Sequence, residues 1–123
     1  MIILDSSIII AAFRRNEIHH QDAINIMKQN EDIMILDYVI TEVATVLKMR
    51  EGETIANKCL DFLVNNQNIE ICFLNNDEFS KTVNYFLNHK NKLSFIDTAL
   101  FVFSKSKKIA LATFDKELGK SFN

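Results

Sequence analysis

The sequence predicts a single α/β domain in which a parallel four-stranded sheet carries helices on both faces. Short apolar runs alternate along the chain with segments whose apolar residues recur at the period of an amphipathic helix, and this alternation is typical of parallel sheets. The chain has 123 residues, 48% of them apolar, which suits one domain with a substantial core. No repeat or low-complexity linker divides the sequence, so we expect one domain over residues 1–123.

The first part of the chain predicts a strand followed by two helices. Residues 2–4 are all apolar, as in a short buried strand. Residues 6–13 are mostly apolar and are expected to be helical. Residues 19–29 place apolar side chains at helical spacing, which predicts a second helix. His19 and His20 are expected to be ordinary residues at the start of this helix, with a contact to substrate as the alternative.

A second strand and two amphipathic helices are predicted next. Residues 32–36 contain the apolar run of the strand. Residues 38–50 repeat apolar residues on one helical face, at Val39, Val43 and Leu47. Residues 54–64 show the same periodicity, which predicts another helix of this kind.

The last part of the chain repeats the alternation of strands and helices. The expected elements are a strand at 69–73, helices at 79–87 and 95–106, a strand at 109–112 and a short helix at 115–120. Asn75 or Asn76 is the candidate N-cap of the helix at 79–87. Only residues 116–123 follow Asp115, so we expect four strands and no fifth.

Four acidic residues lie where this architecture would bring side chains together: Asp5, Glu42, Asp97 and Asp115. Asp5 follows the first strand, Asp115 follows the last, and Asp97 lies in the first turn of an apolar helix. In open parallel sheets, ligands bind beyond the carboxyl ends of the strands. We therefore expect these carboxylates to converge at that edge of the sheet.

Each of the four residues also has a purely structural explanation. Asp5 and Asp115 can cap the helices that follow them. Asp97 can form a capping box with Ser94. Glu42 falls at the border of the apolar face of its helix and can be a surface residue. Together, however, three aspartates at one edge repel one another unless a cation neutralises them. Their hard oxygen ligands suit Mg²⁺ or Mn²⁺, and such an ion can activate water and orient a phosphodiester.

At these positions the chain resembles the PIN-domain nucleases, and most closely the small VapC-type toxins of toxin–antitoxin pairs. The resemblance extends over nearly the whole chain and rests on four segments in this order: Ile3-Leu4-Asp5-Ser6-Ser7, Thr41-Glu42-Val43, Leu93-Ser94-Phe95-Ile96-Asp97-Thr98-Ala99 and Ala112-Thr113-Phe114-Asp115-Lys116.

The resemblance implies a toxin that cuts RNA with Mg²⁺ or Mn²⁺. Asp5, Asp97 and Asp115 would then hold the metal, and Glu42 would complete a catalytic quartet. Ser6 and Thr113 would steady the site. The implied partners are an RNA substrate, an antitoxin protein and a second copy of the chain, which would pack on the helices between residues 38 and 64.

Two other functional classes are compatible with parts of the pattern. A domain of the same fold could use the acidic cleft only to bind a basic partner. A receiver-like phosphotransfer domain also has an acidic Mg²⁺ pocket, but it needs an aspartate after the third strand, where this chain has Phe73-Leu74-Asn75. A phosphatase with an Asp-x-Asp motif is excluded by Asp5-Ser6-Ser7, and no glycine-rich phosphate loop occurs.

The charge, the cysteines and the N-terminal segment further limit the function and the cellular location that we expect. The formal net charge is −2, which argues against a generic polycation for nucleic acids but not against a local basic patch. Cys59 and Cys72 lack metal-binding spacing and are expected to be reduced, buried thiols. The N-terminal segment lacks the features of a signal peptide or a membrane span, so we expect a cytoplasmic protein.

Overall fold

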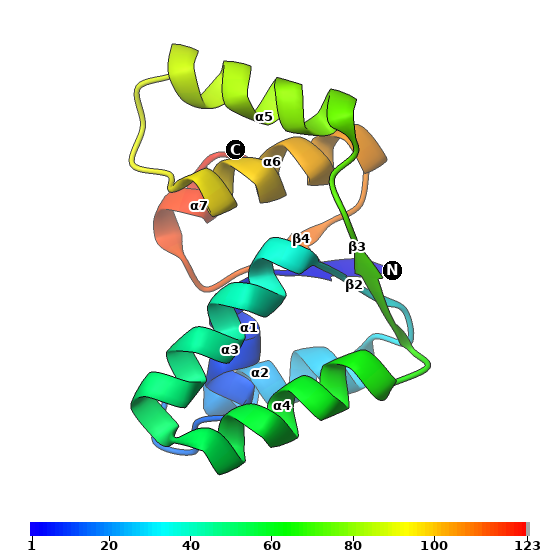
Figure 1. Ribbon diagram of the computed structural model, residues 1–123, viewed down its shortest axis with the longest axis vertical. Helices are drawn as coiled ribbons and strands as arrows, with labels where there is room; N and C mark the ends of the chain where they lie inside the picture. Colours follow the sequence, from blue (N-terminus) through cyan, green and yellow to red (C-terminus); the bar gives the residue numbers. More distant parts are fainter. Residues whose placement is uncertain (123) are drawn as a thin grey trace.

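The computed structural model of the chain describes residues 1–122, which form a parallel sheet flanked by helices (Figure 1). The strands are β1 (Ile2–Leu4), β2 (Ile33–Leu36), β3 (Ile69–Cys72) and β4 (Leu111–Ala112). The helices are α1 (Ser6–Ala12), α2 (His20–Gln29), α3 (Asp37–Glu51), α4 (Glu53–Asn65), α5 (Asn76–Asn88), α6 (Phe95–Lys107) and α7 (Lys116–Lys120). Every strand and helix expected from the sequence is present.

The sheet has the order β3-β2-β1-β4, and all neighbouring strands pair in parallel. The four-stranded parallel sheet predicted from the sequence is therefore confirmed. Strand β1 lies between β2 and β4, and its Leu4 pairs with Ala112. The residues that follow these two partners, Asp5 and Thr113, consequently leave the same edge of the sheet side by side.

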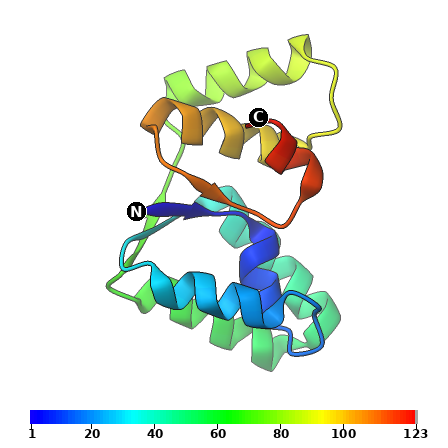
Figure 2. The ribbon, with the colours of Figure 1, turned by 180° about the vertical axis from the view of Figure 1, so that it is seen from behind.

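Helices cover both faces of the sheet. Figures 1 and 2 show α1 to α4 on one side and α5 and α6 on the other. Apart from the partly buried Ile2, the apolar residues of β1 and β2 are almost completely buried between these layers, which explains why their sequences are continuous apolar runs rather than alternating ones. Within residues 1–122, no helix is both long enough and apolar enough to cross a membrane.

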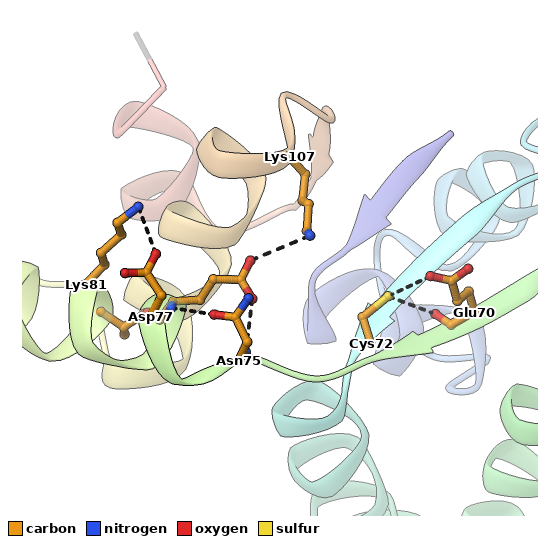
Figure 3. A network of polar contacts seen from close by, with 8 residues as sticks. Glu70, Cys72, Asn75, Asp77, Lys81 and Lys107 are labelled. Atoms are coloured by element: carbon orange, nitrogen blue, oxygen red, sulfur yellow. Dashed lines mark hydrogen bonds and ion pairs between the residues drawn. The ribbon is translucent and has the colours of Figure 1, made fainter.

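Helix α5 is fixed at its start by a capping box and by an ion pair to α6 (Figure 3). The Asn75 side chain accepts a hydrogen bond from the Glu78 amide at 2.8 Å, and the Glu78 carboxylate accepts one from the Asn75 amide at 3.0 Å. The same carboxylate lies 3.9 Å from the ammonium of Lys107, at the end of α6. This box starts α5 at Asn76, three residues before the start expected at residue 79.

Strand β4 is shorter than its sequence predicts because the end of α6 uses part of the apolar run. Lys108 adopts a left-handed conformation with φ of 57°, as at many helix ends. The Ile109 amide then donates to the Ser104 carbonyl at 3.2 Å instead of joining the sheet. The ladder of β4 is left with Leu111 and Ala112.

Candidate active site

Asp5 is the buried centre of the acidic edge. Only 2% of its surface is exposed. Its Oδ1 accepts a hydrogen bond from the Ser6 amide at 2.7 Å, and its Oδ2 accepts from the hydroxyls of Thr113 at 2.6 Å and Ser7 at 2.9 Å. A buried carboxylate needs such donors to offset the water it has lost. The Asp5 side chain is therefore held in one orientation by residues at the carboxyl ends of β1 and β4.

The hydroxyls of Thr113 and Ser7 also fix the loop that carries Asp115. The Thr113 Oγ1 accepts a hydrogen bond from the Asp115 amide at 2.9 Å, and the Ser7 Oγ accepts one from the Phe114 amide at 3.0 Å. Thr113, which the resemblance implied as a polar neighbour of the site, contacts Asp5 directly. Ser6 was expected as well, but its hydroxyl lies 3.4 Å from Asp5, whereas the better-placed hydroxyl belongs to Ser7.

Asp97 forms the capping box expected at the start of α6, and its pKa responds to the charges of the other two aspartates. Its amide donates to the Ser94 Oγ at 3.1 Å, and its Oδ2 accepts from the Ser94 amide at 3.3 Å. Burial raises the pKa of the Asp97 carboxyl, the hydrogen bonds from Ser94 oppose this, and the negative charges of Asp5 and Asp115 raise the pKa further. The structure thus brings Asp5, Asp97 and Asp115 close enough for their charges to interact.

Asp115 is exposed and caps α7. Its Oδ1 accepts hydrogen bonds from the amides of Glu117 at 2.9 Å and Leu118 at 3.1 Å. Capping therefore does not exclude a role of Asp97 and Asp115 in a site, since each uses one carboxylate oxygen for its cap. None of the ion pairs formed within residues 1–122 involves the three aspartates.

Glu42 is not joined to the other three carboxylates by any contact among the described residues. It lies in the second turn of α3, the helix that follows β2, and its side chain is partly buried. It contributes no hydrogen bond or ion pair within residues 1–122 and is not among the causes of the Asp97 pKa shift. Its place in the quartet stays a prediction.

Of two further residues at this edge, Asp37 was not singled out from the sequence, and His19 was expected to be an ordinary helix-start residue with a substrate contact as the alternative. Asp37 begins α3 directly after β2, and its buried Oδ1 has no hydrogen-bond partner among the described residues. His19 stacks on Phe114, with ring centroids 4.4 Å apart, and so lies beside the loop of Asp115. Its neighbour His20 instead contacts the Ala11 carbonyl through Nδ1 at 2.7 Å and joins α2 to α1. The position of Asp37 immediately after an apolar strand is the sequence feature that could have identified Asp37 as a candidate.

The donor atoms of the acidic edge fit a hard divalent cation in their chemistry. Within residues 1–122, no group of three or more His, Cys, Asp or Glu side chains is arranged so that it could hold a metal ion. Mg²⁺, however, keeps several waters and is commonly bound by only one or two carboxylates. Asp97 and Asp115 each have one oxygen that accepts no hydrogen bond from the described residues.

The fold and the converging aspartates agree with a comparison against known protein families. A model of the PIN domain matches residues 2–120, and the chain belongs to this family. The resemblance inferred from the four sequence segments is thereby confirmed. None of the curated proteins matches the chain significantly by sequence.

Solved structures of low sequence identity share the fold. VapC20 of Mycobacterium tuberculosis, described as a sarcin–ricin loop cleaving toxin, has a TM-score of 0.90 at 18% identity, covering 98% of this chain and 95% of that one. FitAcB from Neisseria gonorrhoeae gives 0.71 at 15% identity, covering 96% and 90%. VapBC2 from Rickettsia felis, bound to a DNA fragment from their promoter, gives 0.70 at 14% identity, covering 98% and 92%. At these identities the similarity establishes the fold alone.

Proposed function

We propose that the chain is a divalent-metal-dependent endoribonuclease that hydrolyses RNA phosphodiester bonds at the acidic edge of its sheet. The observation that carries this proposal is the convergence of three aspartates in a PIN fold. Besides burial, the charges of Asp5 and Asp115 raise the pKa of Asp97. Such mutual repulsion favours binding of a cation.

Asp5, Asp97 and Asp115 would hold Mg²⁺ or Mn²⁺, and Glu42 would complete the acidic set from α3. The bound ion would supply Lewis-acid stabilisation of the charge that develops on the phosphate and would favour deprotonation of water. The chain's own contribution is orientation. The hydroxyls of Thr113 and Ser7 hold the Asp5 carboxylate in place before any ligand binds.

The substrate and partners are proposed from the VapC-like resemblance. VapC20 is described as a sarcin–ricin loop cleaving toxin, so an oligonucleotide of that loop is the first RNA to test here.

We propose that the protein is the cytoplasmic toxin of a toxin–antitoxin pair. An apolar hollow of about 400 Å³ between α1, α2 and α4, which includes Phe13, Met27 and Phe62, supports a protein partner. Exposed Leu60 and Val64, four residues apart on α4, support a homodimer contact.

The proposal is tested by incubating the purified protein with RNA in Mn²⁺ and then in EDTA. We expect cleavage in Mn²⁺, none in EDTA, and none by Asp5→Asn. Asp22→Asn, at an exposed position on α2, is the matched control and should cleave like the parent. Cleavage by Asp5→Asn at the parent's rate would contradict the site assignment.

The second candidate is a PIN-fold domain that binds a basic partner without cutting RNA. It is favoured by one observation, namely that no three carboxylates of residues 1–122 are grouped tightly enough to hold an ion directly. This candidate predicts no cleavage of any RNA or DNA in Mn²⁺. It also predicts that Asp115→Asn, at the exposed carboxylate of the edge, weakens binding of an arginine-rich peptide.

A further inference from the structure

A hollow between α5 and α6 is lined by two facing rows of side chains. On α5, Lys81 and Tyr85 are four residues apart and therefore lie on one face of the helix, and His89 follows as its C-cap. On α6, Phe101 and Lys105 follow at the same interval. The hollow has a volume of about 420 Å³, which is within the range of about 300 to 1,000 Å³ of small-ligand sites.

The middle of the hollow is aromatic and rigid. The rings of Tyr85 and His89 stack with centroids 3.7 Å apart and an interplanar angle of 7°. The His89 Nδ1 lies 3.0 Å from the Tyr85 carbonyl, which fixes the orientation of the imidazole. Phe101 faces Tyr85 from α6 at 5.2 Å between centroids. Flat rings held in this way are suited to stacking on the bases of a nucleic acid.

The far end of the hollow is cationic. The Lys105 ammonium lies over the rings of Phe101 and Phe122, 5.7 and 5.1 Å from their centroids, and forms no ion pair with a carboxylate of residues 1–122. Lys81 pairs with Asp77 at 3.1 Å, but this pair is exposed to water and can be exchanged for another anion (Figure 3).

The hollow is built from a basic segment of the chain, of which Lys81 and Lys105 line the hollow itself. Residues 81–108 contain six lysines and a single carboxylate, Asp97, whereas the whole chain has a net charge of −2. The rest of the molecule is therefore markedly acidic. A polyanion approaching the protein is attracted to this segment and repelled by the acidic remainder of the molecule. The acidic edge would cease to repel it once a cation is bound there.

Helix α6 carries residues of both the candidate active site and the hollow. Asp97, Phe101 and Lys105 lie four residues apart on one side of the helix. The rise of about 1.5 Å per residue puts Lys105 roughly 12 Å from Asp97 along the axis. That length corresponds to about three nucleotides of a stacked strand, at about 3.4 Å per nucleotide.

We propose that the hollow between α5 and α6 holds the single-stranded RNA that leads away from the cleavage site. In this arrangement, bases stack on Tyr85, His89 and Phe101, and phosphates contact Lys105 and Lys81. The inference rests on the proposed ribonuclease function, because it takes RNA as the ligand. Aromatic ring faces and cations occur together in the hollow, and the acidic site lies further along the same helix. This arrangement fits a nucleic acid strand better than an apolar protein segment.

The test measures fluorescence anisotropy of a short labelled single-stranded RNA with the parent protein in EDTA, at several salt concentrations. The double variant Lys81→Ala/Lys105→Ala should bind more weakly and lower the slope of log affinity against log salt by about 1.4, since each phosphate contact on a single strand contributes about 0.7. Tyr85→Ala should weaken binding roughly tenfold, and Tyr85→Phe should restore it because the ring is kept.

The matched control is Lys48→Ala/Lys58→Ala, which removes two exposed lysines from α3 and α4 and should leave affinity and salt slope unchanged. Thermal unfolding of each variant checks that the fold is retained. The inference is overturned if the Lys81→Ala/Lys105→Ala protein binds RNA with the parent's affinity and slope, or if the parent binds no RNA. A parent that binds RNA through the hollow but never cleaves it would instead refute the nuclease proposal alone.

Discussion

The hydroxyl of Thr113 donates a hydrogen bond of 2.6 Å to the Oδ2 of Asp5, although 108 residues separate the two in the chain. The contact follows from the register of β1 on β4, in which Leu4 pairs with Ala112. The same hydroxyl oxygen accepts a hydrogen bond from the Asp115 amide at 2.9 Å. One side chain therefore orients two of the three converging aspartates.

Replacing Thr113 by Val should weaken both the fold and the site. Valine keeps the shape of threonine but removes the hydroxyl, so the buried Asp5 loses its shortest hydrogen bond and the Asp115 amide loses its acceptor. A buried polar group left without a partner costs about 1–3 kcal/mol. We expect a loss of that size in urea unfolding and a fall of roughly 10- to 100-fold in RNA cleavage.

Thr113→Ser is the control, because it keeps the hydroxyl and should retain most of the stability and most of the cleavage activity. Equal behaviour of the Val and Ser variants would contradict a role for the hydroxyl.

Ser7 should matter more than Ser6. The Ser7 hydroxyl joins Asp5 to the Phe114 amide, whereas the Ser6 hydroxyl makes only a long contact to Asp5. Ser7→Ala should therefore cost about 1–2 kcal/mol of unfolding free energy, and Ser6→Ala less than about 0.5 kcal/mol. Urea unfolding of the two variants measures the difference. A larger effect at Ser6 would support the assignment made from the sequence alone.

The sequence predicted the elements well because each one is encoded locally. The apolar run of residues 2–4 and the stripe of Val39, Val43 and Leu47 identify a buried strand and a half-buried helix without reference to the rest of the chain. The family was predictable for a related reason. Asp5, Asp97 and Asp115 stand beside strand ends and helix starts, and a parallel sheet collects those positions at one edge.

The details of the site depend on distances that local patterns do not contain. Whether Ser6 or Ser7 supports Asp5 is decided by which hydroxyl points toward Thr113 across the β1–β4 pair. The stacking of His19 on Phe114 joins the loop before α2 to the loop after β4. The position of Glu42 at the border of a helical stripe allowed contact with the site without requiring it, and no contact with the other acids is present within residues 1–122.

Asp97→Asn should stabilise the metal-free protein at neutral pH. Burial and the charges of Asp5 and Asp115 raise the pKa of Asp97 in the folded state above its ordinary value of 3.8. The folded protein then binds this proton more tightly than the unfolded chain does, so stability falls as pH rises from about 3.8 through the folded-state pKa. Asparagine carries no proton to lose, and its oxygen can still accept from the Ser94 amide.

The stability gain of Asp97→Asn should therefore grow with pH over this window. Urea midpoints measured in EDTA, at pH values from below 3.8 to neutrality, test this, since 3.8 is the ordinary carboxyl value. We expect little difference at the acid end and a higher midpoint for the Asp97→Asn variant at neutral pH. A difference that is constant over the whole range would show that the charge of Asp97 is not responsible.

Divalent metal should stabilise the folded protein independently of any RNA. An ion that binds only the folded state adds RT ln(1 + [L]/Kd), which is about 2.7 kcal/mol at 100 times the dissociation constant. We expect Mn²⁺ and Mg²⁺ to raise the unfolding temperature of the parent, with a reduced effect for Asp5→Asn and Asp97→Asn. Asp22→Asn controls for non-specific binding and should respond like the parent. A parent whose unfolding temperature ignores both metals would favour the non-catalytic binding domain.

The two cysteines should be almost inert in the folded protein and should respond differently to one substitution. Burial raises the pKa of both the Cys59 and Cys72 thiols to about 12, so only about one thiol in ten thousand is ionised at pH near 8. Iodoacetamide should label the native protein at least about 100-fold more slowly than the urea-unfolded chain, because the thiolate is the reactive form. Cys72 also donates a hydrogen bond of 3.3 Å to the Glu70 carboxylate, and this bond and the negative charge of Glu70 contribute, after burial, to the raised pKa of Cys72 (Figure 3). Glu70→Gln should therefore accelerate labelling of Cys72 and leave Cys59 unchanged, as mass spectrometry of the labelled peptides can measure. Parallel acceleration at both cysteines would indicate general loosening of the fold rather than loss of the Glu70 charge.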